Sequence, residues 1–263
     1  YCPHLDMIMK LSPFWWDIDT PLIAENNSDG LLSDAEFVIV GGGFTGLSAA
    51  LTIARQGRSV VVLDSGTPGF GASTRNGGIC SGNIRPSHSA LRKTYGRAFA
   101  DEVYAEGIEA RVDLAKFCSE EKIDCDLQMT GRFTGAVCQS DYDAQAREVE
   151  SLNNIDGHAA HMVPKSAQHS EIATDLFFGG MVREEIGGYH PGKFFAGLLR
   201  TAQSAGVVIH SDTTVKDITD LTPSQKSVIT DRGTITAGKV IIATNAYTGT
   251  KERFGQFLRR RLV

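Results

Sequence analysis

The chain has 263 residues, of which 41% are hydrophobic and 22% are charged, with a formal net charge of −5. This composition is ordinary for a globular protein, and the acidic balance disfavours nucleic acid as a partner. No apolar run approaches the roughly 20 residues that a transmembrane helix needs, and the first residues lack the pattern of a secretory signal.

Residues 1–34 are predicted to form a leader that packs on the folded body. We interpret Trp15 and Trp16 as a hydrophobic anchor rather than a binding face, because large aromatic side chains are usually buried. The polar stretch ENNSDG separates this pair from the first predicted strand.

The stretch FVIVGGGFTG begins with a buried strand over residues 37–40 and continues into a glycine-rich turn. A helix is predicted over roughly 44–56, and a second strand over 59–63. Three glycines, at positions 41, 43 and 46, have the G-x-G-x-x-G spacing, which lets a backbone approach a dinucleotide pyrophosphate at a helix N-terminus. The alternative for these glycines is an ordinary tight turn between a strand and a helix.

Asp64 ends the second strand, where a carboxylate can accept hydrogen bonds from the ribose hydroxyls of an adenosine. The same charge would repel a 2′-phosphate and therefore disfavours NADP. Residues 65–87 then form a long glycine-rich stretch instead of the next helix. Long irregular segments are usually functional, and this one has the length to line a flavin beyond its pyrophosphate. We therefore favour FAD over NAD.

The rest of the chain is predicted to alternate helices with short strands. Helices are predicted near 98–121, from Asp141 onward, and over 190–205; strands over 128–137, 207–210, 214–218, 227–230, 234–236 and 240–244; and a hairpin turn at 231–233.

The motifs VIVGGGFTGLSAALTIARQGRSVVVLD, GFGASTRNGG and VIIATNAYTG occur in this order and together resemble the FAD-dependent D-amino-acid oxidase superfamily. The similarity is greatest to its glycine-oxidase and gamma-glutamylputrescine-oxidoreductase-like branch, and covers about residues 14–263. It implies an α/β fold with a Rossmann-like FAD-binding domain of the glutathione-reductase type and part of an α+β substrate domain. The implied segments are 35–128 and 191–263 for the FAD-binding domain and 129–190 for the substrate domain.

The resemblance also implies which residues bind FAD. The pyrophosphate would lie at Gly41, Gly43, Phe44, Thr45 and Gly46; the ribose at Asp64 with Ser65; the phosphates and flavin ring along Gly71, Ala72, Ser73, Arg75, Asn76, Gly77 and Gly78; the adenine at the backbone of Val215; and a second approach to the cofactor at Ala243 and Thr244. Asp64 replaces a commoner glutamate and is one methylene shorter. Arg75 would stabilise negative charge on the reduced ring, and the alternative is an arginine that pairs with a surface carboxylate.

Other polar residues are given structural interpretations. His158, His161 and His169 are interpreted as a solvated helix end, and no metal is expected. His190 is interpreted as a residue at a helix N-terminus. The five cysteines contain no C-x-x-C pair, which favours reduced thiols in a cytoplasmic protein, with Cys80 as a small buried residue rather than a flavin contact.

The activity implied by the resemblance is oxidation of an amine or amino acid. Hydride passes to flavin N5, the imine product hydrolyses, and oxygen or another acceptor takes the electrons; no catalytic side chain is identified. A flavin dehydrogenase that reduces a quinone or partner, and a non-catalytic FAD-binding subunit or fragment, remain alternatives. Chains of this family continue past the segment resembling 259–263. Truncation, clipping or a second chain that supplies the remaining substrate domain are therefore all open.

Overall fold

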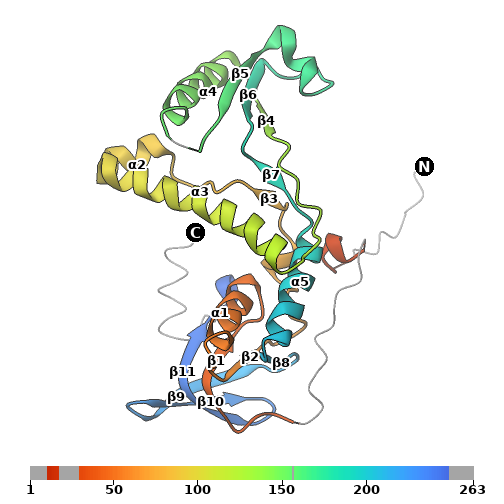
Figure 1. Ribbon diagram of the computed structural model, residues 1–263, viewed down its shortest axis with the longest axis vertical. Coiled ribbons are helices and arrows are strands. Elements are labelled where there is room, and N and C mark those ends of the chain that lie inside the picture. Colours follow the sequence, from red (N-terminus) through yellow and green to blue (C-terminus); the bar gives the residue numbers. More distant parts are fainter. Residues whose placement is uncertain (1–10, 18–29, 156, 249–263) are drawn as a thin grey trace, which may run out of the picture. The chain divides into compact units, whose positions relative to one another are not determined.

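The computed structural model describes residues 11–17, 30–155 and 157–248, and the chain divides into two compact units (Figure 1). Unit 1 combines the residues up to Asn76 with those from Pro191 onward, and unit 2 runs from Gly77 to His190. The sequence placed the first boundary at residue 128, whereas the chain leaves unit 1 directly after Asn76. Cys2, one of the five cysteines, and the segment 259–263 lie outside the described residues.

Unit 1 is built on a six-stranded sheet in the order β8-β2-β1-β11-β10-β9. Strands β8, β2, β1 and β11 run parallel to one another, and β10 and β9 continue the sheet through the antiparallel pairs β11–β10 and β10–β9. The strands are β1 (Asp34–Val40), β2 (Val60–Leu63), β8 (Val208–His210), β9 (Val215–Thr222), β10 (Gln225–Thr230) and β11 (Thr234–Ile242). The predicted α/β fold with a parallel sheet is confirmed.

Two helices of unit 1, α1 (Phe44–Ala54) and α5 (Pro191–Ser204), pack against each other (Figure 1). The ring of Phe44 lies 5.2 Å from that of Phe194. Helix α5 begins at a proline, which suits a first turn because its missing N–H has no partner there in any case. Both helices were predicted within about two residues of their observed bounds.

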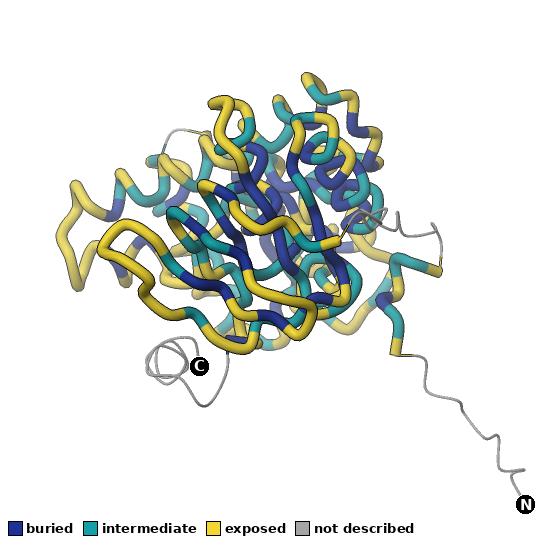
Figure 2. Tube along the Cα trace, turned by 90° about the horizontal axis from the view of Figure 1, so that it is seen from below, coloured by how far each residue is buried: buried dark blue, intermediate teal, exposed yellow. Residues whose placement is uncertain are grey.

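The core of unit 1 is formed by buried residues from both the parallel and the antiparallel part of the sheet. Every residue of β2 is buried, and one buried cluster joins β1, β2, β10 and β11. Its members are Ala35, Val38, Val61, Leu63, Val228, Ile235 and Ala237. In the burial-coloured trace, buried stretches lie inside the fold, and the outward turns are exposed (Figure 2).

Strand β11 corrects one sequence prediction. The two strands predicted over 234–236 and 240–244 form a single strand that ends at Ile242. Gly238 interrupts the apolar pattern, but a β-carbon at this position would lie 2.8 Å from the carbonyl oxygen of Glu36 on β1. Glycine therefore permits close strand pairing here rather than ending the strand. The hairpin turn at 231–233 is confirmed by the pairing of Ile229 with Thr234.

Unit 2 has a three-stranded antiparallel sheet in the order β4-β6-β5, a two-stranded ribbon of β3 with β7, and three α-helices. Its elements are β3 (Ile79–Cys80), α2 (His88–Tyr95), α3 (Arg97–Glu120), β4 (Arg132–Gly135), α4 (Gln139–Leu152), β5 (Ala160–Pro164), β6 (Gly179–Arg183) and β7 (Gly187–Gly188). Helix α2 and strands β5 and β6 were not predicted, and the strand predicted over 128–137 is the shorter β4.

Two of the three histidines interpreted as a solvated helix end correct that interpretation, while His169 does lie near the exposed end of a 3₁₀ helix, Lys165–Ser170. His161 lies on β5, and His158 precedes that strand with only 3% of its side chain exposed, so neither belongs to a solvated helix end. Among the residues that the structure describes, no helix combines the length and apolar character needed to cross a bilayer. The same residues contain no group of three or more His, Cys, Asp or Glu side chains suited to a metal ion.

Candidate FAD-binding site

Three parallel strands of unit 1 end together at the glycine turn. Strand β1 lies between β2 and β11, and its last residue is followed by Gly41, whose N–H donates to the carbonyl oxygen of Leu63 at 2.8 Å. On the other side, the N–H of Ala243 donates to the carbonyl oxygen of Val40 at 2.8 Å. In open α/β sheets, ligands bind outside the carboxyl ends of such strands.

Backbone atoms occupy the place of a side chain at Gly41 and Gly46, and a side chain at Gly43 would displace that of Ser73. Gly41 has a φ of +107°, and a β-carbon there would lie 2.6 Å from the carbonyl oxygen of Ala243. At Gly46 a β-carbon would overlap the carbonyl oxygen of Gly41, and at Gly43 it would lie 2.9 Å from Ser73 Oγ. The turn is therefore a cradle of bare backbone, as the binding of a pyrophosphate requires.

Helix α1 starts from this cradle. Its N-cap residue, Gly43, provides no side-chain cap, and the N–H of Phe44 donates to Ser73 Oγ at 2.9 Å. The N–H groups of a first helical turn have no partner within their own helix, and the helix dipole makes this end positive. An anion such as a pyrophosphate is the natural ligand of such a helix end.

Asp64 links the end of β2 to the same turn. Its Oδ2 accepts the N–H of Gly42 at 2.8 Å, and its Oδ1 accepts the N–H of Gly66 at 3.0 Å. Burial raises the pKa of Asp64 above its usual value. The hydrogen bonds from Gly66 and Gly42 oppose this rise in pKa, and the nearby charge of Asp212 adds to it. Since each carboxylate oxygen has a second lone pair, the group can still accept a ribose hydroxyl.

The loop 70–76 carries the predicted contacts beyond the pyrophosphate. It contains a short 3₁₀ turn, Ala72–Thr74, which begins after Gly71. Besides Ser73, it contributes Arg75, whose Nε donates to the carbonyl oxygen of Phe70 at 2.8 Å and whose guanidinium lies 4.3 Å from the Phe70 ring centre. In this structure the guanidinium of Arg75 thus donates hydrogen bonds to backbone carbonyl oxygens and lies against the ring of Phe70.

The remaining predicted residues lie in three places. Thr45 and Ser65 are exposed beside the cradle, and Thr244 follows Ala243. Val215 begins β9, two residues after Thr213, whose N–H donates to the carbonyl oxygen of Asp64 at 2.7 Å. Asn76 closes the loop 70–76, whereas Gly77 and Gly78 belong to unit 2, and their contact with a cofactor stays a prediction.

Sequence reasoning missed two features of the site. Gly42 was not singled out because the fingerprint leaves its position open, yet its N–H binds Asp64. The run of three successive glycines, 41 to 43, was the available signal. Thr74 was also missed: it is fully buried, and its Oγ1 donates to the carbonyl oxygen of Gly69 at 2.6 Å, fixing the loop.

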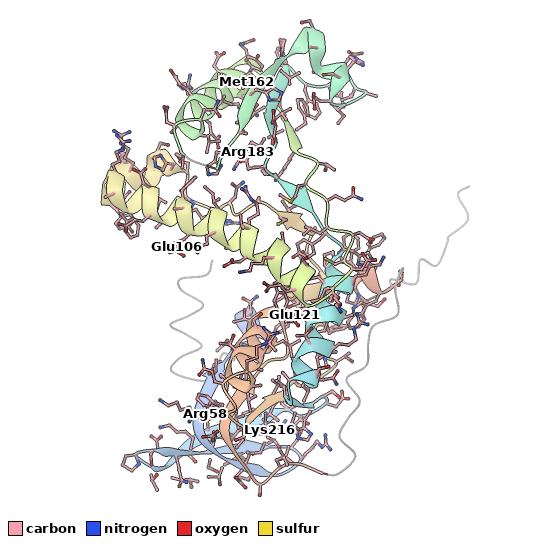
Figure 3. All side chains as sticks on the ribbon, viewed as in Figure 1. Arg58, Glu106, Glu121, Met162, Arg183 and Lys216 are labelled. Carbon is pink, nitrogen blue, oxygen red and sulfur yellow. The ribbon has the colours of Figure 1, made fainter. Side chains whose placement is uncertain are left out.

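A buried charge cluster lies outside this site, in unit 2 (Figure 3). Arg183 on β6 donates to Glu185 Oε1 through Nε at 2.8 Å and Nη2 at 2.5 Å, and its Nη1 donates to Asn83 Oδ1 at 2.6 Å. His158 Nδ1 lies 2.9 Å from the same Glu185 oxygen, and burial lowers the pKa of this histidine. Because these buried polar groups bind one another, we interpret the cluster as a structural network.

Comparison with known proteins agrees with this geometry. The family model described as "FAD dependent oxidoreductase" (DAO) matches residues 36–262. The chain is 30% identical to gamma-glutamylputrescine oxidoreductase of Escherichia coli (strain K12) over 213 residues, which cover 81% of this chain and 49% of the relative. The chain spans about half the length of the curated relatives it matches.

Solved structures show the same fold. Glycine oxidase from Geobacillus kaustophilus superposes with a TM-score of 0.70 at 24% identity, covering 82% of this chain and 56% of that one. L-amino acid deaminase from Proteus myxofaciens has a TM-score of 0.70 at 18% identity, covering 87% and 49% of the respective chains.

Proposed function

Because the chain belongs to the DAO family of FAD-dependent oxidoreductases, we propose that unit 1 binds FAD and that the protein oxidises an amine or amino acid. The observation that carries the proposal is the meeting of the glycine cradle, the start of α1 with its glycine N-cap, and Asp64 at one edge of the sheet. Bound FAD would accept the hydride that leaves the carbon next to the substrate nitrogen.

The protein's own residues would bind and orient the cofactor. The first-turn N–H groups of α1 offer donors and a positive helix end to the pyrophosphate. Asp64, already fixed by Gly42 and Gly66, would accept a ribose hydroxyl and repel a 2′-phosphate. Ser73 Oγ, at the N–H of Phe44, lies where the loop 70–76 meets the helix and would orient the phosphate side of the cofactor.

The substrate class is taken from related proteins. Gamma-glutamylputrescine oxidoreductase is named for an amine and glycine oxidase for an amino acid, so we propose a substrate with an oxidisable carbon next to a neutral nitrogen. Oxygen or another acceptor would take the electrons, and a second chain remains a candidate source of further substrate contacts. A cytoplasmic location belongs to the same proposal.

A titration of the purified chain with FAD tests the cofactor assignment. Flavin fluorescence is expected to quench with saturation, and D64N is expected to raise the Kd about tenfold, because the buried amide cannot accept from both Gly42 and Gly66 N–H groups without a mismatched donor. D34N is the matched control, since the Asp34 side chain is exposed and accepts a hydrogen bond from neighbouring Ser33. Absence of saturable binding would contradict the assignment.

Anaerobic addition of amines and amino acids then tests the reaction. Loss of the visible flavin absorbance on adding one of these substrates supports the oxidoreductase. Reoxidation by air indicates an oxidase, and reoxidation only by a quinone indicates the dehydrogenase alternative. Bound FAD that no amine or amino acid reduces would contradict catalysis by this chain and favour a binding subunit.

A further inference from the structure

We propose that residues 11–16, here called the N-terminal strap, hold the loop 70–76 in the conformation that offers Ser73 to helix α1. FAD affinity would then depend on a segment that precedes the dinucleotide-binding fold. The inference rests on the proposed function of unit 1. All residues that carry it belong to this unit.

The first connection is a relay of hydrogen bonds. Trp15 Nε1–H donates to the carbonyl oxygen of Asn76 at 2.8 Å, across 61 positions of sequence. Asn76 Nδ2 in turn donates to the carbonyl oxygen of Ser73 at 2.8 Å, and Ser73 Oγ accepts the N–H of Phe44 at 2.9 Å. The strap is thereby linked to the first residue of α1 through three successive bonds.

The second connection is made by Arg75. Its Nη2 donates to the carbonyl oxygen of Leu11 at 2.8 Å, while its Nε donates to the carbonyl oxygen of Phe70. One guanidinium therefore joins the strap to the start of the loop, and the ring of Trp16 lies 5.9 Å from that of Phe70. The strap is thus hydrogen-bonded to the end of the loop at Arg75 and Asn76, and its Trp16 contacts the start of the loop at Phe70.

This arrangement has a consequence for binding energy. A loop without regular structure loses conformational entropy when a ligand orders it, and prior ordering removes that cost from the binding step. The loop 70–76 contains only one short 3₁₀ turn and is otherwise held by side-chain hydrogen bonds such as that of Thr74, so the bonds to the strap add to its order. Trp15 is thus a positioning residue that acts on Ser73 through Asn76, whereas Arg75 positions the loop through Phe70. Neither needs to touch the cofactor for this role.

W15F tests the relay, because phenylalanine keeps an aromatic ring and removes the N–H donor. We expect the FAD Kd to rise about threefold to tenfold, with a faster rate of FAD release. L11A is the matched control: it removes an exposed side chain of the strap but keeps the backbone carbonyl that Arg75 binds. Its Kd is expected to equal that of the wild type.

A double-mutant cycle with S73A separates positioning from general destabilisation. If the strap acts through Ser73, W15F adds little in the S73A background, and the Kd of the double variant stays within about 1.5-fold of that of S73A alone. Fully additive effects, or an unchanged Kd in W15F, would overturn the inference.

Hydrogen exchange of the apo protein distinguishes this inference from the proposed function. Amides of residues 70–76 are expected to exchange at least about fivefold faster in W15F than in wild type or L11A. Unchanged exchange would overturn the strap whether or not FAD binds. If exchange is faster in W15F but the wild-type chain binds no FAD, the strap is supported as a tether and only the proposed cofactor function is rejected.

Discussion

The carbonyl oxygen of Gly41 occupies the space that a β-carbon at Gly46 would need. This contact brings the first turn of α1 directly against the end of β1, so the helix N-terminus points at the same edge of the sheet as the strand ends. The third glycine of the fingerprint is therefore required by packing between helix and strand, and the first two by the shape of the cradle.

G46A is expected to destabilise unit 1 by about 3 kcal/mol, because the backbone must move to relieve the overlap. G66A is the matched control: a β-carbon at Gly66 meets no atom within 4 Å, and its φ lies outside the left-handed region. Its free energy of unfolding should change by less than about 0.5 kcal/mol. Urea denaturation followed by tryptophan fluorescence measures both, and equal midpoints for G46A and wild type would refute the packing argument.

The buried ion pair of unit 2 gives a second prediction. Arg183 and Glu185 are 6% and 8% exposed in their side chains, so R183M leaves a buried carboxylate without its main counter-charge. We expect a loss of about 3–5 kcal/mol, and partial recovery in the double variant R183M/E185L, where neither charge remains. Thermal and urea unfolding of the two variants measure the effect.

The exposed pair of Arg58 and Glu36 in unit 1 is the control for this experiment (Figure 3). Arg58 Nε lies 2.8 Å from Glu36 Oε1, which is similar to the distances in the buried pair, but half of the Arg58 side chain is exposed. R58M should therefore cost no more than about 1 kcal/mol. A loss in R183M as small as that in R58M would show that burial does not decide the strength of these pairs.

The sequence predicted what depends on local pattern. Strands β1 and β2, helices α1 and α5, and the steric roles of Gly41 and Gly46 follow from apolar runs, proline and glycine placement, and spacing. Strands β5 and β6 were not predicted. The segment that forms β6, which starts at Gly179, is short and glycine-rich, and the strands with which it pairs lie far away along the chain. Strand pairing is decided by such distant contacts.

The same reasoning explains two further contacts that the sequence did not predict, one in each unit. The bond from Trp15 to Asn76 joins residues 61 positions apart, and no spacing rule connects them. Burial of His158 depends on Glu185 and Arg183, which reach it from the end of another strand. A polar neighbourhood in sequence indicated solvent, whereas in the fold these polar groups satisfy one another.

His210 makes stability depend on pH. It is fully buried at the end of β8, and neither ring nitrogen has a hydrogen-bond partner among the described residues. Burial, together with the charge of Arg232, lowers its pKa below the ordinary value of 6.5. The unfolded chain therefore binds a proton more readily than the folded one, and folding stability must decrease as the pH falls below about 6.5.

H210F is expected to flatten this dependence, because phenylalanine fills a similar volume and takes up no proton. Urea unfolding between pH 8 and pH 5 should show a smaller loss for H210F than for wild type, with most of the difference arising below about pH 6.5. H161Q is the control, since the His161 side chain is 49% exposed. His158, whose pKa burial also lowers, contributes to unit 2 with the same sign and remains in both proteins. An identical slope in H210F and wild type would mean that the imidazole of His210 gains no proton on unfolding, contrary to its burial without partners.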